Sequence, residues 1–232
     1  MIKKGVEVSG MNQSSNAKMG KDRRHFIALA LALGISGPWG AVNAQNKTGP
    51  VLVLGDSLSA EYGLNRGKGW VKLLEQRLQE QKNPRAVVNA SISGDTTSGG
   101  RARLPALLSQ HKPSIVILEL GGNDALRGLP LQSSQSNMEA MVKASRDAGA
   151  KVMLVGMQVP PNYGASYTEQ FAQMFQSIAS QNKLPLLPFL LAGFGDSPDA
   201  MQWFQSDRIH PNAEAQPRML ENVWPKLKPM LN

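Results

Sequence analysis

VLVLGDSL, at residues 51–58, joins a run of four apolar residues to a glycine, an aspartate and a serine. The apolar run is typical of a strand buried on both faces, as in a parallel sheet. The sequence therefore places Ser57 just beyond the end of a strand. In an open parallel sheet, ligands bind at this edge, outside the carboxyl ends of the strands.

Four further apolar runs follow, and longer amphipathic stretches separate them. The predicted strands cover residues 51–54, 86–89, 115–120, 152–156 and 184–189. The predicted helices cover residues 68–82, 98–111, 132–148, 166–182 and 216–231. Pro225 is expected to kink or divide the last of them. The alternation predicts a three-layer α/β/α sandwich around a parallel sheet of about five strands. Right-handed crossovers gather all the strand-to-helix loops at one edge of that sheet.

Residues 1–44 are interpreted as a signal peptide. A basic segment leads into the apolar residues 26–33, a stretch far shorter than the roughly 20 residues of a membrane-spanning helix. We therefore expect no stable membrane anchor, and cleavage before Gln45 leaves residues 45–232 as one domain. The pair Arg23-Arg24 resembles the twin-arginine export signal, with the general secretory route as the alternative.

The composition excludes several classes of site and partner. The chain carries a formal charge of +8, of which residues 1–44 hold six basic and two acidic side chains, so each part carries +4. Without a basic block, this mild excess gives no indication of nucleic-acid binding. The chain has no cysteine, which excludes a disulfide framework, a thiol nucleophile and a cysteine zinc site.

Asp207 and His210 supply the groups that a serine nucleophile needs. A serine hydroxyl is weakly nucleophilic unless a base takes its proton, and the base works best when a carboxylate fixes its tautomer. Of the three histidines, His25 lies in the leader, and His111 precedes the third predicted strand, at the opposite edge from the serine. The candidate triad is therefore Ser57, His210 and Asp207.

Two further segments follow predicted strands at the same edge, Ser93-Gly94-Asp95 and Gly121-Gly122-Asn123-Asp124. An acyl-transfer site needs donors aimed at the oxyanion that forms when serine attacks a carbonyl. Gly94 lets the backbone approach a substrate closely, and the amide of Asn123 offers two N–H groups. Either residue alone would be an ordinary turn residue. Their shared edge with Ser57 favours the oxyanion role.

The serine segment lacks the second glycine of the G-x-S-x-G elbow of α/β-hydrolases. Instead, four blocks in this order resemble the SGNH (GDSL) hydrolases, and the resemblance covers residues 50 to about 229. It is strongest to the family's periplasmic thioesterases and arylesterases. The family's name lists its serine, glycine, asparagine and histidine, and its acid stands three residues before the histidine. These match Ser57, Gly94, Asn123, His210 and Asp207.

The resemblance implies a flavodoxin-like SGNH hydrolase fold and an oxyanion hole made of Ser57, Gly94 and Asn123. It implies hydrolysis of small-molecule acyl esters and thioesters, without metal or organic cofactor, by a bacterial protein that is periplasmic or secreted. Deacetylation of carbohydrates or other small esters on the same fold is the alternative. Glu61 departs from the thioesterase pattern, which has a small residue at this position, and the leaving-group preference is left open.

Two apolar loops at the same edge are candidates for the wall of an acyl pocket. They supply Leu126, Leu129, Pro161 and Tyr163 as candidate substrate-binding residues. The alternative is that the leucines simply cap the core, as loop leucines commonly do.

Two other classes of function stay open as alternatives. Asp56, Asp95 and Asp124 each follow a predicted strand at one edge, where carboxylates could hold Mg²⁺ in a phosphohydrolase. That interpretation leaves Ser57 and His210 without roles. A periplasmic binding module is the non-enzyme alternative, but one small domain has no hinge between two lobes.

Overall fold

The computed structural model describes residues 48–83, 85–159 and 161–232. The predicted signal peptide, its cleavage site and Pro160 lie outside the described residues. The described helices include none that combines the length and the apolar character needed to cross a membrane.

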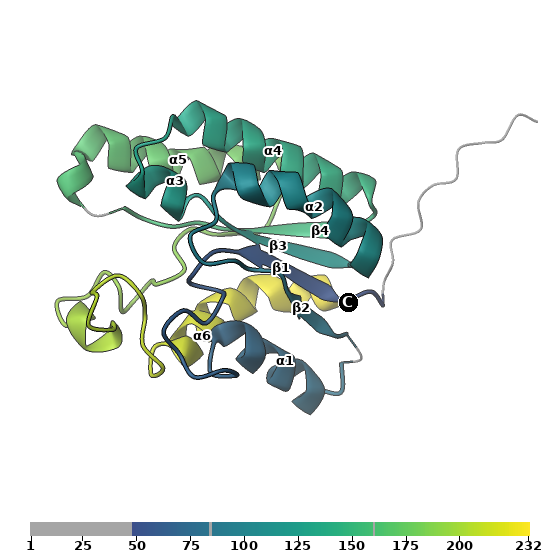
Figure 1. Ribbon diagram of the computed structural model, residues 1–232. Coiled ribbons are helices and arrows are strands. Elements are labelled where there is room, and N and C mark those ends of the chain that lie inside the picture. Colours follow the sequence, from purple (N-terminus) through teal and green to yellow (C-terminus); the bar gives the residue numbers. More distant parts are fainter. Residues whose placement is uncertain (1–47, 84, 160) are drawn as a thin grey trace, which may run out of the picture. The chain divides into compact units, whose positions relative to one another are not determined.

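The described residues form one sheet of five parallel strands, in the order β2-β1-β3-β4-β5 (Figure 1). The strands are β1 Val51–Gly55, β2 Val87–Asn89, β3 Ile115–Glu119, β4 Lys151–Val155 and β5 Leu186–Leu187. This is the strand order of flavodoxin-like doubly wound sheets, and it confirms the predicted fold class. Every residue of β1 and β3 is buried, which explains why both appear in the sequence as nearly continuous apolar runs.

Helices cover both faces of the sheet, with α2, α4 and α5 on one face and α1 and α6 on the other (Figure 1). Alternate residues of β1 enter the two cores: Val51 and Val53 pack towards α1 and α6, Leu52 and Leu54 towards the other helices. The helices are α1 Trp70–Glu80, α2 Thr97–His111, α3 Gly122–Leu126, α4 Leu131–Asp147, α5 Ala165–Asn182 and α6 Gln216–Leu227, with 3-10 helices η1 Pro161–Tyr163, η2 Ala200–Trp203 and η3 Lys228–Leu231.

The structure differs from the predicted elements in three places. The last strand has only two residues, because Pro185 and Pro188 flank it and have no N–H to extend the ladder. The last helix continues through Pro225, and the change to a 3-10 helix comes at Lys228. The short helix α3 lies where a loop was expected. It is too short for its periodicity to show in the sequence.

Candidate active site

Ser57 lies in a tight turn directly after β1. The carbonyl of Asp56 accepts hydrogen bonds from the backbone N–H groups of Ser59 (3.2 Å) and Ala60 (2.9 Å). The side chain of Asp56 closes the same turn, because its Oδ1 accepts from the N–H of Leu58 at 3.1 Å. This turn holds Ser57 half-buried at the carboxyl edge of the sheet.

Asp207 and His210 form a second turn, in the loop between η2 and α6. Oδ1 of Asp207 accepts from the backbone N–H groups of Ile209 (2.9 Å) and His210 (3.0 Å). Oδ2 of Asp207 lies 2.7 Å from Nδ1 of His210. One oxygen thus shapes the turn and the other holds the imidazole, which explains the spacing of three residues between acid and base.

The two turns meet at the histidine. Nε2 of His210 lies 2.9 Å from Oγ of Ser57, although the two residues are 153 positions apart. With Nδ1–H donating to Asp207, Nε2 is left to accept the serine proton. The structure therefore brings together all three predicted triad residues. His111 ends α2 just before β3, at the opposite edge, as predicted.

Electrostatics keep the acid of this trio ionised. Desolvation by itself raises the pKa of Asp207, but the backbone N–H groups of His210 and Ile209 and the ring of His210 together lower it to about 2. The side chain of Asp207 is 35% exposed, against 18% for His210. A carboxylate that stays charged can hold one tautomer of the imidazole and stabilise the imidazolium.

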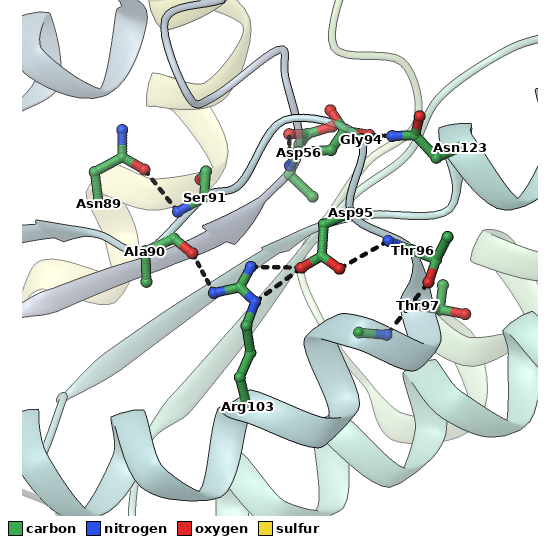
Figure 2. A network of polar contacts seen from close by, with 12 residues as sticks. Asp56, Asn89, Ala90, Ser91, Gly94, Asp95, Thr96, Thr97, Arg103 and Asn123 are labelled. Atoms are coloured by element: carbon green, nitrogen blue, oxygen red, sulfur yellow. Dashed lines mark hydrogen bonds and ion pairs between the residues drawn. The ribbon is translucent and has the colours of Figure 1, made fainter.

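The predicted oxyanion donors lie in the segments that follow β1, β2 and β3. Gly94 has a φ of 77°, a backbone conformation that side-chain-bearing residues rarely adopt, and its carbonyl accepts from Nη2 of Arg127 at 2.8 Å. Asn123 lies in the first turn of α3, and its amide is turned towards Asp56 (Figure 2). Within the described residues, the backbone N–H groups of Ser57 and Gly94 have no protein acceptor. They are free to bind an oxyanion.

Arg103 of α2 anchors the loop that carries Gly94. Nε of Arg103, on α2, donates to Asp95 at 2.8 Å, and the same guanidinium donates to the carbonyl of Ala90 (Figure 2). The other oxygen of Asp95 accepts from the N–H of Thr96 at 2.9 Å. Asp95 therefore fixes the loop around Gly94.

A family model provides an independent comparison: the GDSL-like Lipase/Acylhydrolase family matches residues 53–217. The chain belongs to this family. Esterase TesA of Pseudomonas aeruginosa is 52% identical over 181 residues, which cover 78% of this chain and 89% of the relative. Thioesterase 1/protease 1/lysophospholipase L1 of Escherichia coli K12 is 42% identical over 182 residues, covering 78% and 85%.

Two further comparisons agree. An arylesterase of Vibrio mimicus is 42% identical over 184 residues, covering 79% of this chain and 90% of the relative. A crystal structure of TesA superposes with a TM-score of 0.75 at 51% identity, covering 78% of this chain and 99% of that chain. Family membership confirms the resemblance seen in the four sequence blocks and the prediction of a carboxylic ester hydrolase.

Sequence reasoning missed a buried carboxyl group behind the serine turn. Glu119, the last residue of β3, is 3% exposed. Its Oε2 accepts from Oγ of Ser59 at 2.7 Å and from the backbone N–H of Asp56 at 3.3 Å. Burial, and then the charge of Asp56, raise the pKa of Glu119 well above its usual value. The surroundings of Glu119 therefore favour its protonated form.

The position opposite Glu119 has to be a glycine. Gly55 pairs with Glu119 in the register of β1 and β3. A Cβ atom at Gly55 would lie 2.6 Å from Oε2 of Glu119 and 2.9 Å from the side chain of Ser59. The glycine of the serine block thus leaves room for the buried carboxyl.

The sequence analysis also missed two side chains around the histidine. The ring of Tyr62 lies against that of His210, with centroids 4.3 Å apart and the planes tilted by 38°. Gln205 joins the two loops, because its Nε2 donates to the carbonyls of Tyr62 (2.8 Å) and Pro211 (3.1 Å), and its N–H to that of His210 (2.8 Å). These contacts hold the base against the serine turn.

Glu61, which stands where the thioesterases have a small residue, stabilises its own loop. Its carboxylate accepts from the N–H groups of Gly67 (3.0 and 3.1 Å) and Gly69 (2.8 Å). Its backbone adopts a φ of 60°. The side chain therefore folds onto its own loop and fixes the segment that leads into α1.

The candidate acyl-pocket residues occupy different environments. Leu126 is 44% and Leu129 37% exposed, at the end of α3 and just beyond it. Tyr163, in η1, is half-buried and packs against the core cluster of α2, α4 and α5. Pro161 begins the same 3-10 helix. The two leucines are thus open to a ligand, whereas Tyr163 is partly used by the core.

The three aspartates of the rival metal interpretation bind protein groups. Asp95 pairs with Arg103, and Asp124 accepts from the backbone (2.8 Å) and hydroxyl (2.5 Å) of Thr97. Asp56 accepts from Asn123 at 3.0 Å. Across the described ranges, no group of three or more His, Cys, Asp or Glu side chains is arranged to hold a metal ion.

Proposed function

We propose that the protein is a serine hydrolase that cleaves acyl esters and thioesters through Ser57, His210 and Asp207. The observation that carries this proposal is the unbroken chain of contacts from Oγ of Ser57 to Nε2 of His210 (2.9 Å) and from Nδ1 of His210 to Asp207 (2.7 Å). A nucleophile, its base and the residue that orients the base are the parts that acyl transfer requires.

The geometry supports a two-step reaction. As Oγ of Ser57 attacks the carbonyl carbon, its proton passes to Nε2 of His210, and the carbonyl oxygen becomes an oxyanion. The backbone N–H groups of Ser57 and Gly94 and the amide of Asn123 donate to that oxyanion. His210 then gives the proton to the departing alcohol or thiol, which leaves an acyl-serine. Water, deprotonated by the same imidazole, hydrolyses this ester and restores the serine.

The substrate class follows from the relatives and from the surface around the site. The relatives named above are an esterase, an arylesterase and a thioesterase/lysophospholipase. In the described part of the chain, the exposed large apolar side chains all lie in the segments that follow the strands, on loops or in the short helices α3 and η2. These are Tyr62, Ile92, Leu126, Leu129, Met201 and Ile209. An apolar rim favours acyl chains longer than acetyl, with Leu126 and Leu129 as its wall and Tyr163 at its border, while Pro161 stays a candidate from the sequence.

Deacetylation of small esters is the alternative on the same fold. Initial rates on p-nitrophenyl esters of two to sixteen carbons separate the two, since a deacetylase would be fastest on the acetyl ester and decline at once. We expect the maximum at medium chain length, because each buried methylene contributes about 0.8 kcal/mol until the pocket is full.

The nucleophile is tested with Ser57→Ala and a fluorophosphonate probe. The substitution removes one oxygen, so the variant should stay folded, lose ester hydrolysis and take up no label. Mass spectrometry of the labelled wild type should find the adduct on Ser57. An adduct on Ser59, Ser91, Ser93 or Ser98 would contradict the assignment, and activity abolished by EDTA would favour the metal-dependent alternative.

We also propose that the protein is exported to the periplasm or secreted, on the basis of the leader at residues 1–44. Fractionation of expressing cells, followed by N-terminal sequencing of the mature protein, tests this. We expect a mature chain that begins at Gln45, and a cytoplasmic chain of full length would contradict the export.

A further inference from the structure

We infer that Asp56 is a positioning residue of the oxyanion hole, which acts by holding the amide of Asn123 in its donating orientation. The inference rests on the proposed function. Nδ2 of Asn123 donates to Oδ2 of Asp56 at 3.0 Å (Figure 2). Asp56 is 3% exposed and Asn123 is half-buried, so this contact is partly shielded from solvent.

The segment from Glu119 to Asn123 contacts both the backbone and the side chain of Asp56. Glu119, at the end of β3, accepts from the backbone N–H of Asp56 at 3.3 Å. Asn123, four residues further on, donates to the side chain. The other carboxylate oxygen accepts from the N–H of Leu58, in the turn that carries Ser57. The carboxylate therefore links the nucleophile turn directly to the segment that supplies the side-chain oxyanion donor.

The chemistry of the two side chains fixes the direction of the amide. An ionised carboxylate only accepts hydrogen bonds, whereas an asparagine presents an acceptor at one end and two N–H donors at the other. Asp56 must therefore face the NH₂ end of Asn123. One N–H is used in that contact, and within the described residues Nδ2 makes no second hydrogen bond. The second N–H of Asn123 is left for the oxyanion. The side-chain carbonyl of Asn123, which would repel the oxyanion, is turned away from Asp56.

This selection depends on the charge of Asp56. Burial raises the pKa of Asp56 to about 6, against the hydrogen bonds from Leu58 and Asn123 and the attraction of His210. Asp95 adds a smaller upward shift. The groups that face the Asp56 side chain thus come from its own turn, from α3 and from the loops after β2 and β5, and Glu119 of β3 contacts its backbone N–H. Below pH 6 the protonated acid also presents a donor, so it no longer requires the NH₂ end of Asn123.

The test is a double-mutant cycle of Asp56→Asn and Asn123→Ala, with kcat and KM measured on a soluble aryl ester. An asparagine at position 56 offers one acceptor oxygen to two donors. Asn123→Ala alone should lower kcat by roughly 10²- to 10³-fold, with KM little changed. Asp56→Asn should lower kcat about 30-fold in the wild type, but about threefold or less beside Asn123→Ala. Equal losses in both backgrounds would overturn the inference.

A second measurement needs no change at Asp56, so it decides the question even if that variant does not fold. As the pH falls through about 6, kcat/KM of the wild type should lose about 30-fold more than that of Asn123→Ala, because protonated Asp56 no longer selects the NH₂ end of Asn123. Equal losses in the two proteins would overturn the inference. An active, labelled Ser57→Ala would refute the proposed function. Additive losses with Ser57 still the labelled residue would refute the positioning role alone.

Discussion

Ser57 lies between two carboxylates whose environments are opposite. On the open side, Asp207 is 35% exposed, and hydrogen bonds from its own turn lower its pKa to about 2 despite desolvation. On the interior side, Asp56 is 3% exposed, and burial raises its pKa to about 6. Each carboxylate holds one polar side chain of the site, His210 or Asn123. At Asp207 the hydrogen bonds and the charge of His210 together outweigh desolvation, whereas at Asp56 desolvation outweighs the hydrogen bonds.

The open side is disrupted most severely by His210→Ala. Base and nucleophile act as one unit, so kcat should fall about 10⁶-fold, close to the loss expected for Ser57→Ala. Steady-state kinetics on an aryl ester gives the comparison. His111→Ala, which changes a histidine at the other sheet edge, is the matched control and should leave the rate unchanged. A dead His111→Ala with an active His210→Ala would reverse the assignment of the base.

Asp207→Asn should cost less, about 10⁴-fold in kcat, because the imidazole remains but its tautomer is no longer selected. In the wild type the low pKa of Asp207 means that its protonation reduces activity only below about pH 4. The ratio of wild-type to Asp207→Asn kcat, measured from pH 8 down to pH 4, checks this, because losses common to both proteins cancel in the ratio. A ratio that already falls above pH 4 would show that the hydrogen bonds of Asp207 are weaker than the structure gives.

On the interior side, the effect of Glu119 should appear in the pH dependence of the free energy of unfolding. The raised pKa of Glu119 means that its contribution is complete below the pKa of an unfolded glutamate, about 4.3, and is lost as pH rises. A glutamine at position 119 does not titrate, so Glu119→Gln does not lose this stability as the pH rises. The free energy of unfolding of the variant, minus that of the wild type, should therefore increase with pH. The slope is at most about 1.4 kcal/mol per pH unit.

Urea unfolding at pH 5, 6.5 and 8 measures this difference. The matched control is Glu75→Gln, at a partly exposed glutamate beside Lys72 on α1, whose effect on the free energy of unfolding should be small. A Glu119→Gln variant with a constant difference from the wild type at all three values would show that Glu119 is ionised in the folded protein.

The smallest effect is expected at the rim of the open side. Leu129→Asp should lower kcat/KM on octanoyl esters by about tenfold and leave acetyl esters nearly unchanged, because only the longer chain reaches that wall. Rates on the two p-nitrophenyl esters provide the measurement, with the free energy of unfolding as the control. An equal loss on both esters would show that Leu129 supports the catalytic loop instead of contacting the acyl chain.

The same contrast explains how much the sequence could predict. Asp207 and His210 make their mutual contacts within three residues, so their spacing alone indicates the turn. Asp56 finds its partners at positions 119 and 123, and only the parallel register of β1 and β3 brings them together. The signal for Glu119 was present, since a carboxyl inside an apolar run must be paired or protonated. The sequence could not say which residue would face it.

Gly55 and Glu119 also restrict the order in which this site can change. A methyl group at position 55 has no space while the Glu119 carboxyl lies 2.6 Å from where it would stand. The two positions are therefore epistatic: a substitution of Gly55 requires a smaller residue at position 119 and also a change at Ser59, whose Cβ would lie 2.9 Å away. Variants that change Gly55 alone should therefore all be destabilised. Part of the room for a side chain at position 55 has to come from the neighbouring strand, 64 positions later in the chain.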